Sequence, residues 1–165
     1  MLVLYTYYFL KNNSFPSGFN NHLRQEIAKI ESITGKSFGG KKRPLLFSVR
    51  SGAQVSMPGM METVLNVGLC PKTLPGLAKE TQDEKFSYDS YRRLITMYSD
   101  VVMDKGTNTN KNIREILEKI LAEKKSSLNV LEDSSLSVAD LQEICSIYKS
   151  KILSVLNHSF PDNPH

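Results

Sequence analysis

An arginine followed by small residues is the strongest candidate for chemistry in this sequence. Arg50 ends a run of alternating apolar and polar residues and is followed by Ser51-Gly52-Ala53. A guanidinium group offers forked donors that match phosphate oxygens, and small residues let backbone N–H groups approach an anion. An arginine at the end of a strand is more often solvated or salt-bridged, however. The pattern alone therefore leaves a phosphate contact and a structural role both open.

The segment Ser56-Met57-Pro58-Gly59-Met60-Met61 extends this candidate site. Pro58 and Gly59 break any helix at its centre, so the segment predicts a turn. A helix beginning after the turn would leave N–H groups free for an anion. Together with Arg50, the turn predicts half of a phosphate cradle.

The methionines and tyrosines are better explained by packing. Met57, Met60 and Met61 have no Cys or His beside them, which favours packing over a soft-metal site. The aromatic residues of the second half stand at helical spacing, which favours core tyrosines with solvated arginine neighbours over stacking on bases. These residues are Tyr88, Tyr91, Tyr98, Arg92 and Arg93. Without a clear basic stripe, we expect no nucleic-acid partner.

The cysteines and the N-terminus indicate a protein of the reducing cytoplasm. Cys70 and Cys145 are the only cysteines, and their spacing fits neither a metal site nor a redox motif. Met1–Leu10 is apolar, but a membrane-spanning helix needs about twenty residues. A signal peptide would have a basic flank before the apolar run, whereas Lys11 follows it. We therefore expect no membrane partner, and a first helix that faces a core or forms an exposed apolar end.

Length and composition fit one domain or two small lobes that share a core. The chain has 165 residues, of which 40% are hydrophobic and 23% charged, as in ordinary globular proteins. Its net charge of +4 suits a polyanion such as a nucleoside triphosphate, but many soluble domains carry such a charge.

The first part of the chain predicts a mixture of helix and strand. A helix is expected from Asn20 or Asn21 to Gly35, because apolar residues recur at helical spacing before the glycine. Gly39–Pro44 predicts a basic, flexible loop. Leu45–Arg50 alternates with a period of two and predicts a strand. Glu62–Leu69 predicts a short helix after the turn.

The second part predicts helices only. The proline- and glycine-containing segment Cys70–Gly76 marks a boundary. Three apolar stripes follow, within residues 86–102, 113–121 and 141–156, joined by polar connections. Ser137 and Asp140 open the third helix in the manner of a capping box. The predicted fold class is α+β and mostly helical, with a partial α/β nucleotide-binding lobe at residues 1–69 and an all-helical subdomain at residues 70–165.

Leu45–Leu69 closely resembles the signature of pyruvate, phosphate dikinases. Phe86–Met103 resembles a second stretch of that family, and Phe15–Phe19 and Ile30–Phe38 resemble the helix before the strand. The family has an N-terminal ATP-grasp region, a swivelling central domain with a phosphorylated histidine, and a C-terminal barrel. With magnesium, these enzymes convert ATP, phosphate and pyruvate to AMP, pyrophosphate and phosphoenolpyruvate. The resemblance implies a partial ATP-grasp lobe, with ATP and Mg²⁺ as ligands.

The resemblance also assigns site residues. By it, Arg50 contacts the ATP phosphates, and Gly59 and Met61 belong to the loop that closes over the polyphosphate. Ser56, Met60 and Thr63 fall in the same loop, with roles that the resemblance does not specify. It implies no metal ligand in this chain.

Several family features are not found in the sequence. The glycine-rich segment with its phosphate-binding lysine, the acidic metal ligands and the central domain do not occur, and His22, His158 and His165 match none of that domain's motif. Phosphoryl transfer depends on positioning and on metal-assisted charge stabilisation. We therefore expect no complete set of catalytic residues, weak ATP binding, and no dikinase activity from this chain alone.

At two places the sequence departs from the family pattern, and these departures bear on the origin of the chain. Gly39–Arg43 replaces an acidic, proline-containing family loop, and Cys70-Pro71-Lys72 stands where the family has Asn-Asp. Such departures fit a split or decaying gene, and a trimmed segment equally well. The alternative function is that of a non-catalytic helical interaction protein or a gene remnant. Besides ATP, the expected partners are the remaining dikinase segments or a second copy of the chain.

Overall fold

The computed structural model describes residues 8–9, 11–50, 63–107 and 111–164. The chain forms two compact units, Met1–Lys36 and Ser37–His165. The sequence also predicts a boundary between residues 69 and 70, which separates a partial nucleotide-binding lobe from a helical subdomain. That boundary stays a prediction.

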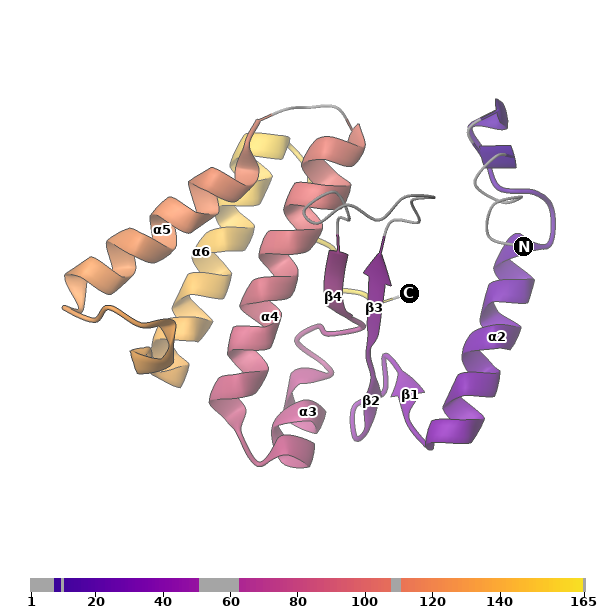
Figure 1. Ribbon diagram of the computed structural model, residues 1–165, viewed down its shortest axis with the longest axis horizontal. Coiled ribbons are helices and arrows are strands. Elements are labelled where there is room, and N and C mark those ends of the chain that lie inside the picture. The colour runs from indigo at the N-terminus through magenta and orange to yellow at the C-terminus, as the bar shows by residue number, and fades with distance from the viewer. Residues whose placement is uncertain (1–7, 10, 51–62, 108–110, 165) are drawn as a thin grey trace. The chain divides into compact units, whose positions relative to one another are not determined.

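The first unit contains the predicted helix, α2, which runs from Phe19 to Thr34 (Figure 1). Gly35 ends it in the left-handed conformation at φ 63°, and its N–H donates to the carbonyl of Glu31. No residue of α2 is buried. Within the apolar stretch Met1–Leu10, Tyr8 and Phe9 are described, and both are exposed. Of the two alternatives expected for this stretch, these two rings fit the exposed apolar end and not the core-facing helix.

The second unit begins with two pairs of short strands (Figure 1). β1, Ser37–Phe38, pairs in parallel with β2, Pro44–Leu45. β3, Phe47–Arg50, pairs antiparallel with β4, Thr63–Val67. The strand predicted over Leu45–Arg50 is therefore present, interrupted at Leu46.

The short helix predicted for Glu62–Leu69 is wrong, because residues 63–67 form the strand β4. Thr63, Val64 and Val67 are β-branched and favour a pleated surface, and Val64 turns into the core. This strand pairs with β3 along one edge.

The rest of the second unit is helical. α3 spans Leu74–Thr81, α4 Glu84–Tyr98, α5 Ile113–Ser127 and α6 Val138–Leu156. A π-helical turn, Ser99–Asp104, and a 3₁₀ turn, Lys105–Thr107, extend α4, and Asp133–Ser135 forms another 3₁₀ turn. The described residues between Phe86 and Leu156 contain no strand, as predicted. The predicted capping box of Ser137 and Asp140 is confirmed, whereas α3 was not predicted.

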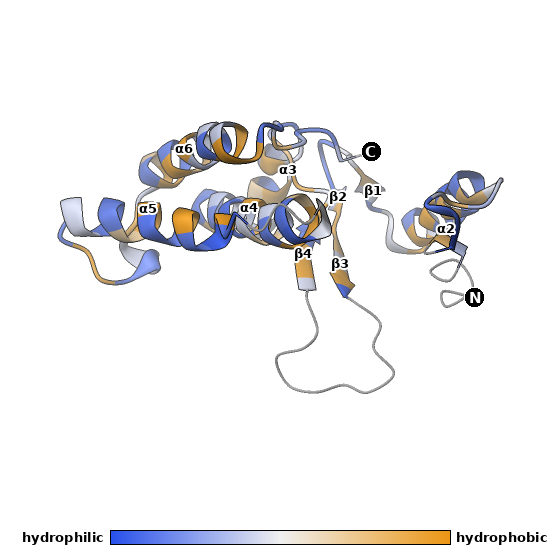
Figure 2. Ribbon diagram, turned by 90° about the horizontal axis from the view of Figure 1, so that it is seen from above, coloured by the Kyte–Doolittle hydropathy of each residue, from blue (hydrophilic) through white to orange (hydrophobic). Residues whose placement is uncertain are grey.

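The helices of the second unit pack on one apolar core, and each presents a polar face outward (Figure 2). α4 contributes Tyr91, Leu94 and Ile95, and α6 contributes Ile144, Tyr148 and Ile152 among others. Val64 of β4 belongs to the same cluster. The strand pair β3–β4 is therefore anchored to the helices through β4.

A buried carboxylate joins α4 to the start of α5. Asp104 is 2% exposed, and it accepts hydrogen bonds from the backbone N–H groups of Lys111 at 2.8 Å and Ile113 at 2.9 Å. The Ile113 N–H belongs to the first residue of α5 and that of Lys111 lies two residues before it, so neither has a partner within the helix. The side chain of Asp104 therefore caps a helix that lies after it in the chain.

We predict that Asp104→Ala lowers the free energy of unfolding by about 2 kcal/mol, because it leaves the buried Ile113 N–H without its acceptor. Asp104→Asn keeps one carbonyl acceptor and is the matched control, with a smaller expected loss. Urea unfolding followed by circular dichroism measures both. Equal losses for the two variants would contradict a capping role.

Candidate phosphate-binding hairpin

Two of the predicted site residues lie opposite each other at one end of the β3–β4 pair. Arg50 is the last residue of β3 and Thr63 the first of β4, and the two are partners in the strand register. Val49 and Val64 form the next pair. The pairing therefore fixes both ends of the segment 51–62, which carries the predicted turn, at the same end of the hairpin.

The other predicted site residues, Ser56, Gly59, Met60 and Met61, lie outside the described residues. Their assignment to a phosphate loop stays a prediction. Arg50 itself is exposed, and no ion pair joins it to another described residue. The sequence has no acidic residue between Glu31 and Glu62, so the hairpin end fits an anion better than a cation.

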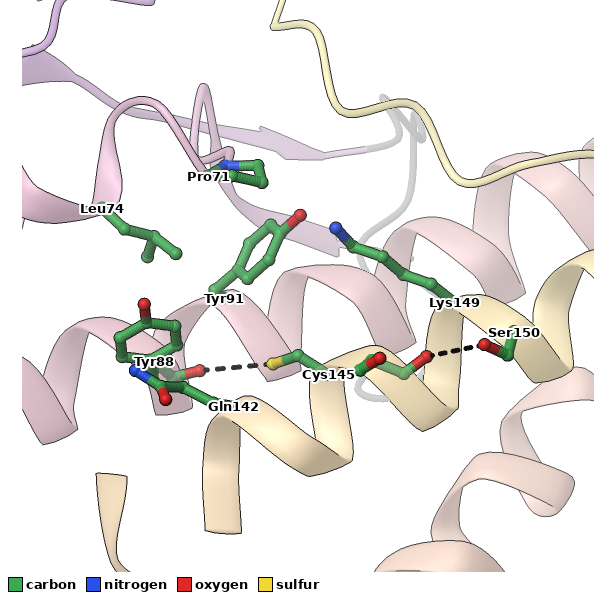
Figure 3. Close-up of a pocket in the computed structure, with 9 residues that line it drawn as sticks. Pro71, Leu74, Tyr88, Tyr91, Gln142, Cys145, Lys149 and Ser150 are labelled. Carbon is green, nitrogen blue, oxygen red and sulfur yellow. Dashed lines mark hydrogen bonds between the residues drawn. The ribbon is translucent and has the colours of Figure 1, made fainter. Parts of the chain in front are cut away.

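A separate pocket of about 500 Å³ lies between α4, α6 and the turn before α3 (Figure 3). Its walls combine apolar and aromatic side chains with polar side chains of α6. They are Pro71, Leu74, Tyr88, Tyr91, Gln142, Cys145, Ser146, Lys149 and Ser150. None of the predicted site residues contributes to it.

Two polar side chains of this pocket, Tyr91 and Lys149, share a carboxylate acceptor that lies outside its walls. Asp162 accepts a hydrogen bond from the Tyr91 hydroxyl at 2.7 Å and one from the Lys149 ammonium at 2.6 Å. The ammonium also lies 5.1 Å from the centre of the Tyr91 ring, within cation–π range. Burial, followed by the bond to Asp162, raises the pKa of Tyr91 above its ordinary value. The network therefore fixes the segment after α6 to α4.

Cys145 is unsuited to nucleophilic chemistry. Burial raises the pKa of its thiol to about 12, so it stays protonated at neutral pH, and only the thiolate is a nucleophile. Both cysteines are free and buried. Within the described ranges, no three His, Cys, Asp or Glu side chains gather closely enough to hold a metal ion.

The tyrosines behave as predicted, but one of their arginine neighbours does not. Tyr91 is buried, and Tyr88 and Tyr98 pack against the core. Arg92 was expected to be solvated, yet it is 6% exposed and pairs with Asp89 at 2.6 Å and Asp133 at 2.9 Å. Burial acts to lower the pKa of Arg92, but the hydrogen bond and charge of Asp89 outweigh it and raise the pKa. Its role is structural.

Neither the Tyr91–Lys149–Asp162 network nor the pair of Arg92 with Asp133 could be found from the sequence. Tyr91 and Asp162 are separated by 71 positions, and Arg92 and Asp133 by 41. No local motif marks contacts of that kind.

Several known proteins that share one name are similar to this chain. No family model matches the chain. Over 157 residues it is 44% identical to pyruvate, phosphate dikinase of Rhizobium meliloti, which covers 95% of this chain and 17% of that protein. It is 39% identical over 160 residues to the enzyme of Clostridium symbiosum, covering 96% of this chain and 18% of that protein.

A plant dikinase is also similar to most of the chain. The chain is 40% identical over 151 residues to pyruvate, phosphate dikinase 1, chloroplastic, of Zea mays, which covers 92% of this chain and 15% of that protein. The chain is similar to pyruvate, phosphate dikinases along nearly its whole length. It spans between 15% and 18% of the length of the three relatives, and is thus similar to one segment of them.

None of the helices in the described part of the chain is both long enough and apolar enough to cross a bilayer.

Proposed function

We propose that this chain is the part of a pyruvate, phosphate dikinase that contacts the phosphates of ATP. Its similarity to dikinases along 95% of its length supports this proposal, as does the pairing of Arg50 with Thr63 at one end of a hairpin. By the resemblance described above, the complete enzymes use ATP, phosphate and pyruvate with Mg²⁺. Residues 1–69 would form the partial ATP-grasp lobe and residues 70–165 its helical subdomain, in an enzyme of the cytoplasm.

The contribution of this chain to the reaction would be electrostatic. Arg50 offers forked, permanently charged donors to the phosphate oxygens. The turn at Ser56–Met61 would add backbone N–H groups around the same anion. The residues around Arg50 suit phosphate rather than Mg²⁺, because no carboxylate lies between Glu31 and Glu62 in the sequence. Arg50 would position the polyphosphate and neutralise part of its charge, which is the main contribution of a protein to phosphoryl transfer.

We predict that the isolated 165-residue chain binds Mg·ATP with a dissociation constant on the order of millimolar or weaker. A charge-assisted hydrogen bond contributes about 1.5–3 kcal/mol, whereas millimolar binding already requires about 4 kcal/mol. Arg50→Ala should abolish the residual binding. Titration calorimetry with Mg²⁺ and ATP measures it, and conversion of pyruvate to phosphoenolpyruvate should be undetectable.

Arg24→Ala is the matched control, since it removes one exposed positive charge from α2, outside the hairpin. It should leave the weak ATP signal unchanged. Micromolar affinity, or binding that Arg50→Ala does not alter, would show that the phosphate site lies elsewhere or is more complete than proposed.

A further inference from the structure

The β3–β4 pair contains one extra residue on β4. Phe47 stands opposite Val67 and Val49 opposite Val64, so a step of two residues on β3 corresponds to a step of three on β4. Such a mismatch is a β-bulge, which bends the bulged strand and is common next to functional sites. The bulge lies between the base of the hairpin, at Phe47 and Val67, and the end that carries Arg50.

Asn66 provides the backbone conformation of the bulge. Its φ is 61°, in the left-handed region, and no other residue of β3 or β4 has a positive φ. Asparagine tolerates this region better than most residues, whereas a β-branched residue rarely adopts it. The residue type at this position therefore decides how easily the bulge forms.

The bulge allows two valines of β4 to face the same core. Val64 is 5% exposed and belongs to the core cluster, and Val67 packs against that cluster. The two are three residues apart, and in a regular strand residues three apart lie on opposite faces. The extra residue turns both valines toward the helices. Thr63 and its partner Arg50 are consequently left on the other face of the hairpin.

The base of the hairpin is held against its neighbours. The Leu69 N–H donates to the Asn66 carbonyl at 3.0 Å. Directly after β4, a Cβ on Gly68 would lie 2.7 Å from the Leu45 carbonyl oxygen, so the two backbones are already in close contact. This packing opposes sliding of β4 at the base. A change of register would therefore appear at the end of the hairpin that carries the predicted phosphate site.

Without the bulge, the surroundings of Arg50 would change. A regular ladder counted from Phe47 and Val67 would set Val64 opposite Arg50. An apolar side chain would then stand beside the guanidinium group, at the place where the bulged register puts the hydroxyl of Thr63. The bulge therefore decides which side chain of β4 shares the outer face with Arg50.

We propose that Asn66 is a positioning residue for the phosphate site, because the bulge that it forms sets Thr63 rather than Val64 beside Arg50. This inference rests on the proposed function, in which Arg50 contacts the phosphates of ATP. A hydroxyl beside the guanidinium group offers a further hydrogen-bond donor to a phosphate oxygen, and the forked donors of arginine act only in a defined direction. Asn66 acts through the register and needs no contact with ATP.

The test is a series of substitutions at Asn66 in the full chain. Mg·ATP is titrated, and the NMR shifts of the Arg50 and Thr63 amides report binding, which suits weak affinities. Asn66→Gly should bind within about twofold of the original chain, because glycine adopts positive φ freely. Asn66→Ala should bind more weakly, and Asn66→Val about tenfold more weakly. In Asn66→Val, the cross-strand Overhauser contacts of Arg50 should move from Thr63 to Val64.

Asn129→Val is the matched control. Asn129 also has a positive φ, 54°, but it lies exposed in the turn after α5. Both valine variants should lose stability, whereas only Asn66→Val should lose Mg·ATP binding. Equal loss of binding in the two valine variants would overturn the positioning role. If Asn66→Val does not fold, the comparison of Asn66→Ala with Asn66→Gly decides, and equal binding by these two would likewise overturn it.

Arg50→Ala separates this inference from the proposed function. If Arg50→Ala removes the Mg·ATP response and the Asn66 series does not alter it, only the positioning role is wrong. If Arg50→Ala leaves the response unchanged, the proposed phosphate contact is wrong and the positioning role falls with it.

Discussion

Replacing Ile152 by alanine is expected to lower the free energy of unfolding of the unit Ser37–His165 by about 3–4 kcal/mol. Ile152 is 0% exposed and lies on α6 within the apolar core. Truncation removes buried methyl and methylene groups and leaves a cavity that helices packed on several sides cannot fill. This loss is a large part of the stability of a domain of this size.

The adjacent residue provides the control. Leu153 is 49% exposed on the same helix, so Leu153→Ala should cost less than about 0.5 kcal/mol. Urea unfolding followed by circular dichroism compares the two variants. If both lost the same stability, the assignment of the α6 face that packs on the core would be wrong.

Gly76→Ala is expected to destabilise the same unit by about 2–3 kcal/mol, as an overpacking substitution. Alanine normally stabilises a helix relative to glycine. Helix propensity alone would therefore predict a gain in stability, whereas we expect a loss. A Cβ on Gly76 would lie 2.3 Å from the Lys41 carbonyl oxygen and 2.9 Å from the Lys41 carbonyl carbon. These are backbone atoms of the basic loop, which cannot move aside as the end of a flexible side chain can.

Gly106→Ala is the control, because its Cβ would meet only the Val101 carbonyl oxygen, at 3.2 Å. Its effect should stay within about 1 kcal/mol. Hydrogen exchange gives a second readout. In Gly76→Ala the amides of Ser37 and Gly40, which close the loop, should exchange faster. Unchanged exchange and stability would show that α3 does not pack against this loop.

The helices α4, α5 and α6 could be predicted because their apolar residues recur at helical spacing and one side of each packs on the core. The strand β4 could not, since Val64, Leu65 and Val67 fit a short apolar helix as well as a strand. Its pairing with β3 decides between them. α3 was missed because Pro75 and Gly76 normally interrupt helices, whereas here Pro75 stands in the first turn, where its missing N–H costs nothing.

The candidate site was predictable only in part. The sequence places Arg50 at a strand end, but the hairpin that sets it opposite Thr63 depends on the strand β4. Arg92 looked like a solvated helix residue because its partner Asp133 is 41 positions away. The roles of Gly59 and Met61 depend on family resemblance, not on a periodic pattern.

The bond between Tyr91 and Asp162 has a consequence for synthesis on the ribosome. Tyr91 lies in α4, yet its hydroxyl finds its acceptor 71 positions later, and Phe160 packs edge-on against its ring at 6.3 Å. A nascent chain can form α4 early, but the surroundings of Tyr91 are complete only after residues 160–162 have left the exit tunnel. The packing around Tyr91 therefore waits for residues 160–162, however early α4 forms.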